Sequence, residues 1–195
     1  MIHKLLVLLQ PIRGPEVLHM NALNTGLLVL RLVVGIALAA HGAQKLFGWW
    51  GGPGLQGLHG HLTQMRFRPA ALWVAGAIGT EIGGGALLAM GLLSPLGSVG
   101  VGAAMLMAIV AFHWGKGFFG QRGGLETPLL YLVAAAAVGI TGPGSYSLDS
   151  LFGISLPEPV LGLVAAGLAV GGVAIAMVGR RPAAPAEQTT QRLAA

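Results

Sequence analysis

Apolar residues in this chain gather in long blocks separated by short polar stretches, without the alternation of an amphipathic helix or strand. A bilayer core of about 30 Å is crossed by roughly 20 mostly apolar residues in a helix. Four blocks reach that length and a fifth is shorter, which predicts an all-α helical bundle integral to a membrane. The five membrane helices are expected at 25–46, 70–93, 96–113, 127–141 and 160–178.

The connection between the first two of these helices contains a shorter amphipathic segment. Leu55, Leu58 and Leu62 recur at helical spacing among polar residues, and Trp49 and Trp50 precede them. Tryptophan side chains favour the headgroup region of a membrane, and amphipathic helices lie flat in it. The pattern therefore predicts an interfacial helix near 53–65.

The two ends of the chain differ from the apolar blocks. An apolar run of five residues precedes Pro11; it is too short for a signal peptide and no small-residue cleavage site follows, so 1–24 is predicted to be a retained interfacial segment. Residues 180–195 are rich in Pro, Ala, Gln and Thr and are predicted to be disordered. Between these ends, we expect a four-helix membrane domain at 25–152 and an additional C-terminal membrane helix at 153–179.

Composition and charge exclude a water-soluble protein. Of the 195 residues, 54% are hydrophobic and 9% are charged, whereas soluble domains are about a quarter charged. The net charge is +5, but the basic residues stand at block ends, so the expected partner is the lipid bilayer and not nucleic acid. Five crossings place the two ends of the chain on opposite sides of the membrane. Eight basic residues fall on the side of the C-terminus and two on the side of the N-terminus, which predicts an outside N-terminus and an inside C-terminus.

The chain contains no cysteine, so it can form no disulfide, iron–sulfur cluster or thiolate metal site. Any redox chemistry then depends on a bound cofactor or on a partner protein. His41 and His113 at the membrane boundary are weak evidence for a haem, and His59 and His61 lie on different faces of their expected helix. No metal or haem is predicted.

Glu81 stands near the middle of the second membrane helix, in a stretch rich in glycine. Ionisable groups at that depth are costly and often mark function, and small residues let neighbouring helices approach closely. Two interpretations remain open: a functional carboxylate, or a structural one that holds the bundle together. In either case we expect Glu81 to face the first helix, within hydrogen-bonding reach of His41 or Lys45.

Several polar residues are expected at one rim of the bundle. His41 and Lys45 are four residues apart near the end of the first helix, and His113 and Glu126 lie on the same membrane side. With Lys116, and with Glu81 below them, they form a candidate pocket for an anionic or quinone-like ligand, in which imidazoles and carboxylates transfer protons. The alternative is that the lysines reach to headgroups and each histidine caps a helix.

On the opposite rim, Arg31 lies near the start of the first helix, and Asp149 lies in the loop after the fourth. Because a membrane arginine has few partners, we expect an ion pair between them, and its more favoured role is structural.

These residues also occur in a recognisable order. The first helix carries Arg31 and ends in His41-Gly-x-x-Lys45-Leu-Phe-Gly48. There follow Glu81-x-Gly-Gly, His113 at the end of the third helix, Glu126 at the start of the fourth, and Gly142-Pro143-Gly-Ser-Tyr-Ser-Leu-Asp149. Over about 27–152 this order and spacing resemble the DoxX family of membrane proteins.

The resemblance implies a four-helix protein of the bacterial plasma (inner) membrane, so the fifth helix and the tail depart from the family pattern. The family is named for similarity to a small membrane subunit of an archaeal thiosulfate:quinone oxidoreductase, and some members are linked to membrane-associated oxidative-stress complexes. For this chain, the resemblance implies a quinone-linked oxidoreductase subunit or accessory protein, with membrane protein partners and a quinone as cofactor. Glu81, His41 and His113 are the catalytic candidates, and the ligand-binding candidates are Arg31, Lys45 and Glu126.

Two other functions remain open. The chain is also compatible with a structural anchor or assembly subunit of a membrane complex. A small-solute transporter with Glu81 as the coupling carboxylate is less favoured, because the two halves of the sequence show no inverted repeat.

Overall fold

The computed structural model describes residues 14–156 and 158–178, and within these ranges the regular elements are helices, with no strand. Residues 1–13 of the expected N-terminal segment at 1–24 lie outside the described residues, and so does the expected tail at 180–195. The elements are α2 (Gly14–Phe47), η1 (Trp49–Gly51), α3 (Gly54–Gln64), α4 (Ala70–Gly79), η2 (Thr80–Gly84), α5 (Gly85–Met90), α6 (Ser94–Ala108), η3 (Ile109–His113), η4 (Gly120–Arg122), α7 (Glu126–Thr141), α8 (Leu148–Leu151) and α9 (Glu158–Val178).

Four helical stretches of the described residues are long and apolar enough to cross a membrane: Val17–Phe47, Ala70–Met90, Ser94–His113 and Val160–Val178. The helix Glu126–Thr141 is apolar but shorter. Large apolar side chains on the outer faces of these helices are exposed, among them Val33, Leu72, Val133 and Leu168, as expected where lipid covers them. The predicted all-α membrane bundle is therefore confirmed, and the chain is a multi-pass membrane protein.

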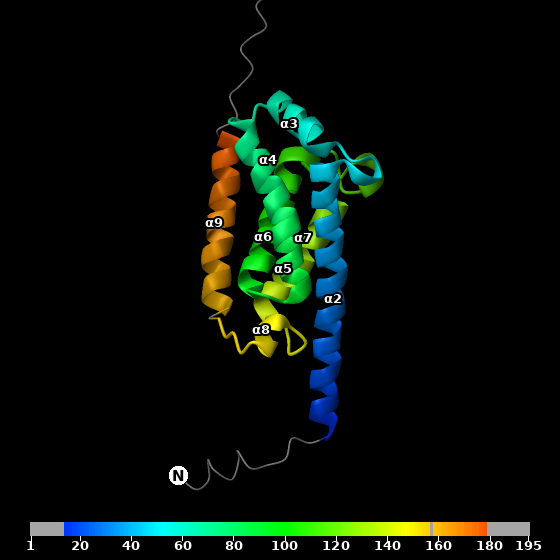
Figure 1. Ribbon diagram of the computed structural model, residues 1–195, viewed down its shortest axis with the longest axis vertical. Helices are drawn as coiled ribbons and strands as arrows, with labels where there is room; N and C mark the ends of the chain where they lie inside the picture. The colour runs from blue at the N-terminus through cyan, green and yellow to red at the C-terminus, as the bar shows by residue number, and fades with distance from the viewer. Residues whose placement is uncertain (1–13, 157, 179–195) are drawn as a thin grey trace, which may run out of the picture.

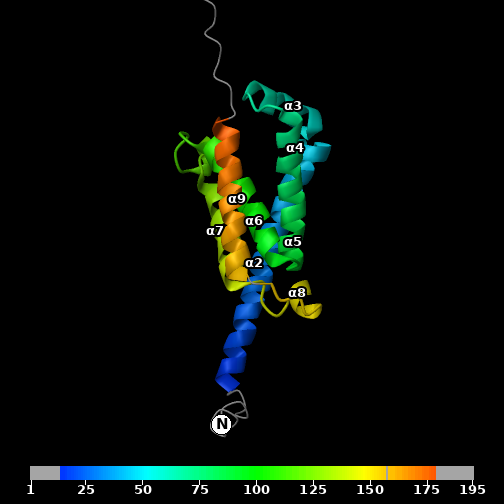
Figure 2. The same cartoon turned by 90° about the vertical axis from the view of Figure 1, so that its left-hand side faces the viewer.

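The helices form a four-helix core with a fifth helix outside it (Figure 1). The core side chains come from α2, α5, α6 and α7: Val34, Leu38, Leu88, Val101, Met105, Ala135 and Val138. The additional helix α9 packs against α6 and α7. The short helix α3 lies across the end of the bundle at which α2 ends (Figures 1 and 2).

Glycines set the closest helix contacts, as the small residues in the sequence predict. A methyl group on Gly35 of α2 would lie 2.4 Å from the carbonyl oxygen of Gly85, and one on Gly85 would lie 2.6 Å from that of Gly35. Gly84 and Gly100 meet in the same way, with a methyl group on either lying 3.3 Å from the α-carbon of the other. These contacts fix η2, which carries Glu81, between α2 and α6.

Replacing Gly35 by alanine should therefore destabilise the bundle by about 1–3 kcal/mol, because the added methyl group meets backbone atoms that side-chain rotation cannot move away. The matched control is Gly26→Ala in the same helix, where a methyl group would meet no atom within 4 Å. Thermal unfolding in detergent should give a lower Tm for Gly35→Ala and an unchanged or slightly higher one for Gly26→Ala. Equal Tm values for the two variants would contradict the close contact.

The first membrane helix is longer than expected. It begins at Gly14, whereas the sequence pattern placed its start near residue 25, with 1–24 as an interfacial segment. The reason is that the polar side chains of Asn21, Asn24 and Thr25 lower hydropathy without breaking a helix, and between Pro15 and Gly26 no proline or glycine interrupts it. The N-terminal turns of α2 extend past the rest of the bundle (Figure 1).

Two of the membrane helices contain a π-helical turn that the apolar pattern does not predict. One is η2, Thr80–Gly84, inside the second crossing, and the other is η3, Ile109–His113, at the end of the third. Short π-helical segments are rare and occur often at functional sites. Here they carry Glu81 and His113.

Candidate functional site

A cavity of about 520 Å³ lies between α4 and η2 on one side and α6, η3 and α9 on the other, with α3 at one end. Most of its walls are apolar or small side chains. Its polar members are Lys45, His61, Thr80, Glu81 and His113. Mostly apolar cavities with a few convergent polar groups are typical binding sites for small molecules.

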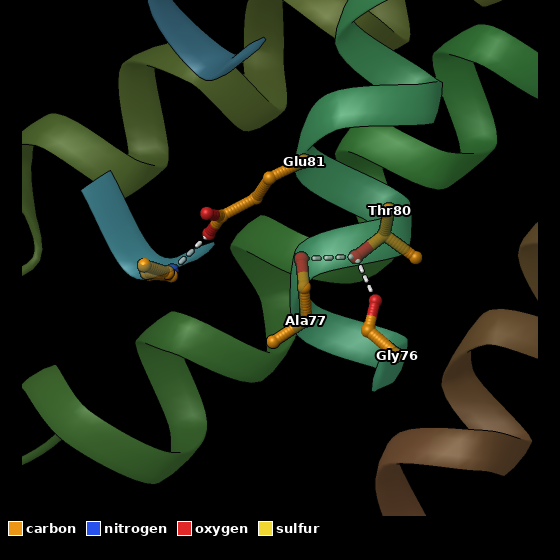
Figure 3. A network of polar contacts seen from close by, with 5 residues as sticks. Gly76, Ala77, Thr80 and Glu81 are labelled. Carbon is orange, nitrogen blue, oxygen red and sulfur yellow. Dashed lines mark hydrogen bonds and ion pairs between the residues drawn. The ribbon is translucent and has the colours of Figure 1, made fainter. Parts of the chain in front are cut away.

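Glu81 forms an ion pair with Lys45 of α2 inside this cavity. Figure 3 shows the Glu81 side chain reaching from η2 towards α2, while Thr80 donates its hydroxyl proton back to the carbonyl oxygens of Gly76 and Ala77. The side chain of Glu81 is 5% exposed and that of Lys45 is 29% exposed. The carboxylate therefore faces the first helix, and its partner is Lys45 and not His41.

The second carboxylate oxygen of Glu81, Oε2, is buried and has no hydrogen-bond partner among the described residues. A buried acceptor left in this state costs about 1–3 kcal/mol. Because Glu81 lines the cavity, a hydrogen-bond donor from a bound molecule would remove that cost. This oxygen is the feature of the cavity that most directly indicates a ligand.

His113 lines the cavity from η3, and a hydrogen bond fixes one of its ring nitrogens. Its Nδ1 lies 2.7 Å from the carbonyl oxygen of Gly123, and a carbonyl can only accept, so Nδ1 carries the proton. Gly123 has φ 73°, a left-handed conformation that glycine adopts without strain, and this lets the loop turn back to His113. With the proton on Nδ1, Nε2 is the ring nitrogen that accepts a hydrogen bond in the neutral form of the imidazole.

Glu126 supports this arrangement without lining the cavity. Its Oε2 accepts the backbone N–H of Gly120 at 2.8 Å, and its own N–H donates to the carbonyl oxygen of Phe118. These bonds hold the loop that contains Gly123. Glu126 is therefore a positioning residue for His113, whereas the sequence placed it among the ligand-binding residues.

Two other residues expected at the rim do not line the cavity. The ring of His41 is exposed and packs edge-on against Tyr131 of α7, with 6.4 Å between ring centroids. Lys116 is exposed in the loop after η3. Of the residues expected at the rim, Lys45, Glu81 and His113 line the cavity. His41 does not.

Among the side chains that sequence reasoning did not place in a pocket are His61, Trp73 and Phe112. His61 of α3 lines the cavity and stacks on Phe112 of η3, with ring centroids 5.8 Å apart, and Trp73 of α4 also lines it. His61 was considered only as a metal ligand with His59. The sequence did carry a signal for His61. It directly precedes Leu62, in a helix whose apolar face must contact the bundle.

At the opposite end of the bundle, Arg31 and Asp149 do not form the expected ion pair, since no nitrogen–oxygen contact within 4 Å joins these two described residues. Arg31 is fully buried and donates to the carbonyl oxygen of Tyr146. Asp149 instead accepts the backbone N–H groups of Leu93 and Ser94, at 2.8 and 2.9 Å, at the start of α6. Asp149 remains near enough to attract the guanidinium, but its direct role is to cap a helix. Arg31, counted as a ligand-binding candidate, lies outside the cavity.

One comparison with known proteins covers the first three crossings of the chain. Neither the curated proteins nor the solved structures give a match to the chain. A family model, DoxX, matches residues 26–114, which run from α2 to the residue after η3 and include Lys45, Glu81 and His113. Glu126, Asp149 and α9 lie beyond the matched residues. This match supports membership of the DoxX family for the part of the chain that supplies the polar side chains of the cavity.

Proposed function

We propose that this chain is a membrane subunit of a quinone-linked redox system, located in the bacterial plasma membrane, and that it binds a quinone-class molecule in its cavity. The observation that carries the proposal is the buried Oε2 of Glu81, which has no partner among the described residues and lies in a largely apolar cavity of about 520 Å³. A molecule with an apolar ring or tail and a hydrogen-bonding head would fill the volume and supply the missing partner.

The polar residues of the cavity fit both redox forms of such a head. Lys45 Nζ uses one bond on Glu81 and retains further donors, which suit the carbonyl oxygens of an oxidised quinone. Glu81 Oε2 and His113 Nε2 are acceptors, which suit the hydroxyl groups of the reduced form. Donors and acceptors therefore line the same cavity, while its other walls suit hydrocarbon.

A bound quinone would supply two-electron, two-proton redox chemistry. The residues of this chain would hold and move the protons: Glu81 accepts one at Oε2, His113 accepts one at Nε2, and Lys45 stabilises the Glu81 anion. Since the chain has no cysteine, electrons would come from another protein or cofactor, and the proposed role includes a redox partner in the membrane.

Binding can be measured through Trp73, which lines the cavity. The other tryptophans, Trp49, Trp50 and Trp114, are exposed and can be replaced by phenylalanine. In nanodiscs, decylubiquinone should then quench Trp73 fluorescence in a saturable way. Quenching that rises linearly with the quinone content of the bilayer would contradict a site. A stoichiometric protein partner found together with such linear quenching would favour an assembly subunit.

Glu81→Gln tests the role of the carboxylate in this site. Glutamine keeps the shape of the side chain but offers a weaker acceptor and a new donor. The variant should fold, bind oxidised decylubiquinone much as the wild type does, and lose about tenfold in affinity for the reduced form, measured by competition, because a charge-assisted hydrogen bond is lost. Unchanged affinity for both forms would show that Glu81 does not contact the head group.

A further inference from the structure

The end of the cavity nearest the aqueous phase is covered by α3. Leu58 and Leu62 of α3 are buried with Phe67, Val74 of α4 and Ala176 of α9 in one apolar cluster. The stacked rings of His61 and Phe112 join α3 to η3 at the same end. A molecule from the water phase would have to disturb these contacts to enter there.

The side of the cavity between α4 and α9 is different. Gly76 of α4 and Gly172 of α9 both line the cavity and are both exposed. A methyl group on either α-carbon would meet no atom within 4 Å. Figure 2 shows α4 and α9 as the two flanks of the bundle on this side, with α3 above them. The two glycines thus mark open space that continues into the cavity.

Both glycines lie at a depth that hydrocarbon occupies. Gly76 is six residues from Ala70, where α4 begins, and Gly172 is six residues from Val178, where the described part of α9 ends. At 1.5 Å per residue each lies roughly 9 Å below the end of its helix. These two ends lie on the same side of the bundle, next to α3 (Figures 1 and 2). The open space therefore faces the acyl chains of a bilayer.

We propose that the cavity opens sideways into the membrane between α4 and α9, through a gap flanked by Gly76 and Gly172, and that the hydrocarbon tail of a bilayer amphiphile lies in this gap. The buried, unpartnered Oε2 of Glu81 lies at the inner end and receives the polar group of that molecule. The gap does not depend on the identity of the ligand, whereas a quinone head at Glu81 rests on the function proposed above.

The helix α9 has a specific part in this arrangement. It lies outside the residues that match the DoxX family model, yet it supplies Ala169, Gly172 and Val173 to the cavity wall. The additional helix thus forms one side of the opening, and its small residues at these positions set the width of the gap.

Brominated lipids test the opening without any quinone. The variant that retains Trp73 as its single tryptophan is placed in vesicles of phosphatidylcholine with brominated acyl chains, and its fluorescence is compared with that in the unbrominated lipid. Bromine quenches tryptophan at short range, so acyl chains in the gap should quench Trp73. Gly76→Leu and Gly172→Leu should each remove most of this quenching, because the leucine side chain occupies the gap.

The matched controls are Gly79→Leu in α4 and Gly171→Leu in α9. A methyl group at either position also meets no atom within 4 Å, but neither glycine lines the cavity. Both controls should keep the quenching of the parent. The opening is wrong if all four variants behave alike, or if Trp73 is not quenched in the parent. If the lipid result is as expected but decylubiquinone shows no saturable binding, the opening stands and the quinone assignment fails.

Discussion

Replacing Lys45 by methionine should destabilise the protein by about 3 kcal/mol, because removing one member of a buried ion pair leaves the other charge without compensation. Glu81 is almost fully buried and Lys45 is its counter-ion. Because the Lys45 side chain is 29% exposed, water can partly solvate the carboxylate in its absence, so the loss should fall at the lower end of the range for buried pairs. Thermal unfolding in detergent should show it as a lower Tm.

A double-mutant cycle separates the ion pair from simple loss of packing. Glu81→Gln in the Lys45→Met background removes the uncompensated charge, and the double variant should recover much of the lost stability. Lys116→Met is the matched control, because Lys116 is an exposed lysine outside the cavity. A Tm for Lys45→Met equal to that of Lys116→Met, or no recovery in the double variant, would mean that the pair does not stabilise the fold.

Replacing Asp149 by alanine should have an effect of similar size at the other end of the bundle, also about 3 kcal/mol, because one buried and one partly buried N–H donor lose their acceptor. These are the N–H groups of Leu93 and Ser94, which begin α6. Asp149→Asn keeps one acceptor oxygen and should lose about half as much. The Tm in detergent should therefore fall in the order wild type, Asn variant, Ala variant.

Ser150→Ala provides the control for this series. Ser150 follows Asp149 in α8 and is exposed. Its backbone N–H donates a hydrogen bond to Ser147 Oγ, and the substitution retains this bond. Its Tm should stay at the wild-type value. If Asp149→Ala unfolds at the same temperature as Ser150→Ala, the carboxylate does not act as a cap for α6.

Hydropathy was enough to predict the four helices that are long and apolar enough to cross a membrane, because it reports which residues lie in lipid. It could not place the start of α2, since asparagine and threonine end an apolar block without ending a helix. It also could not predict the π-helical turns at Glu81 and His113, which depend on how the chain is hydrogen-bonded and packed. The position of Glu81 in the interior was predictable, because exposing a carboxylate to lipid at that depth is energetically costly.

The choice between His41 and Lys45 depended on the rotation of α2, which hydropathy does not determine. Gly35 and Gly42 are seven residues apart and both contact the second crossing closely: Gly35 meets Gly85, and Gly42 meets Ile82. His41 and Lys45 are four residues apart and lie on neighbouring positions of one face of α2, so helix spacing alone does not separate them. In the structure, His41 packs on Tyr131 and Lys45 pairs with Glu81. The two glycines could have identified the face of α2 that meets the second crossing, but not which of the two side chains pairs with Glu81.

For Asp149, the sequence could show that two opposite charges lie at one end of the bundle, but not which hydrogen bonds the carboxylate makes. An ion pair seemed the natural outcome because membrane charges are costly. The free N–H groups at the start of α6 also need acceptors, and a carboxylate at a helix N-terminus satisfies two of them and complements the helix dipole. Recognising this competition requires knowing which helix start lies beside the loop.

The most direct test of the ligand site is to purify the protein in mild detergent, extract it with organic solvent and quantify quinone per protein chain. Ala108→Leu fills the cavity, which Ala108 lines, and Ala136→Leu adds the same side chain at an exposed position on α7. A quinone site predicts near-stoichiometric quinone in the wild type and in Ala136→Leu, and a large loss in Ala108→Leu. The same low quinone content in all three proteins, no higher than in the co-purified lipid, would contradict it.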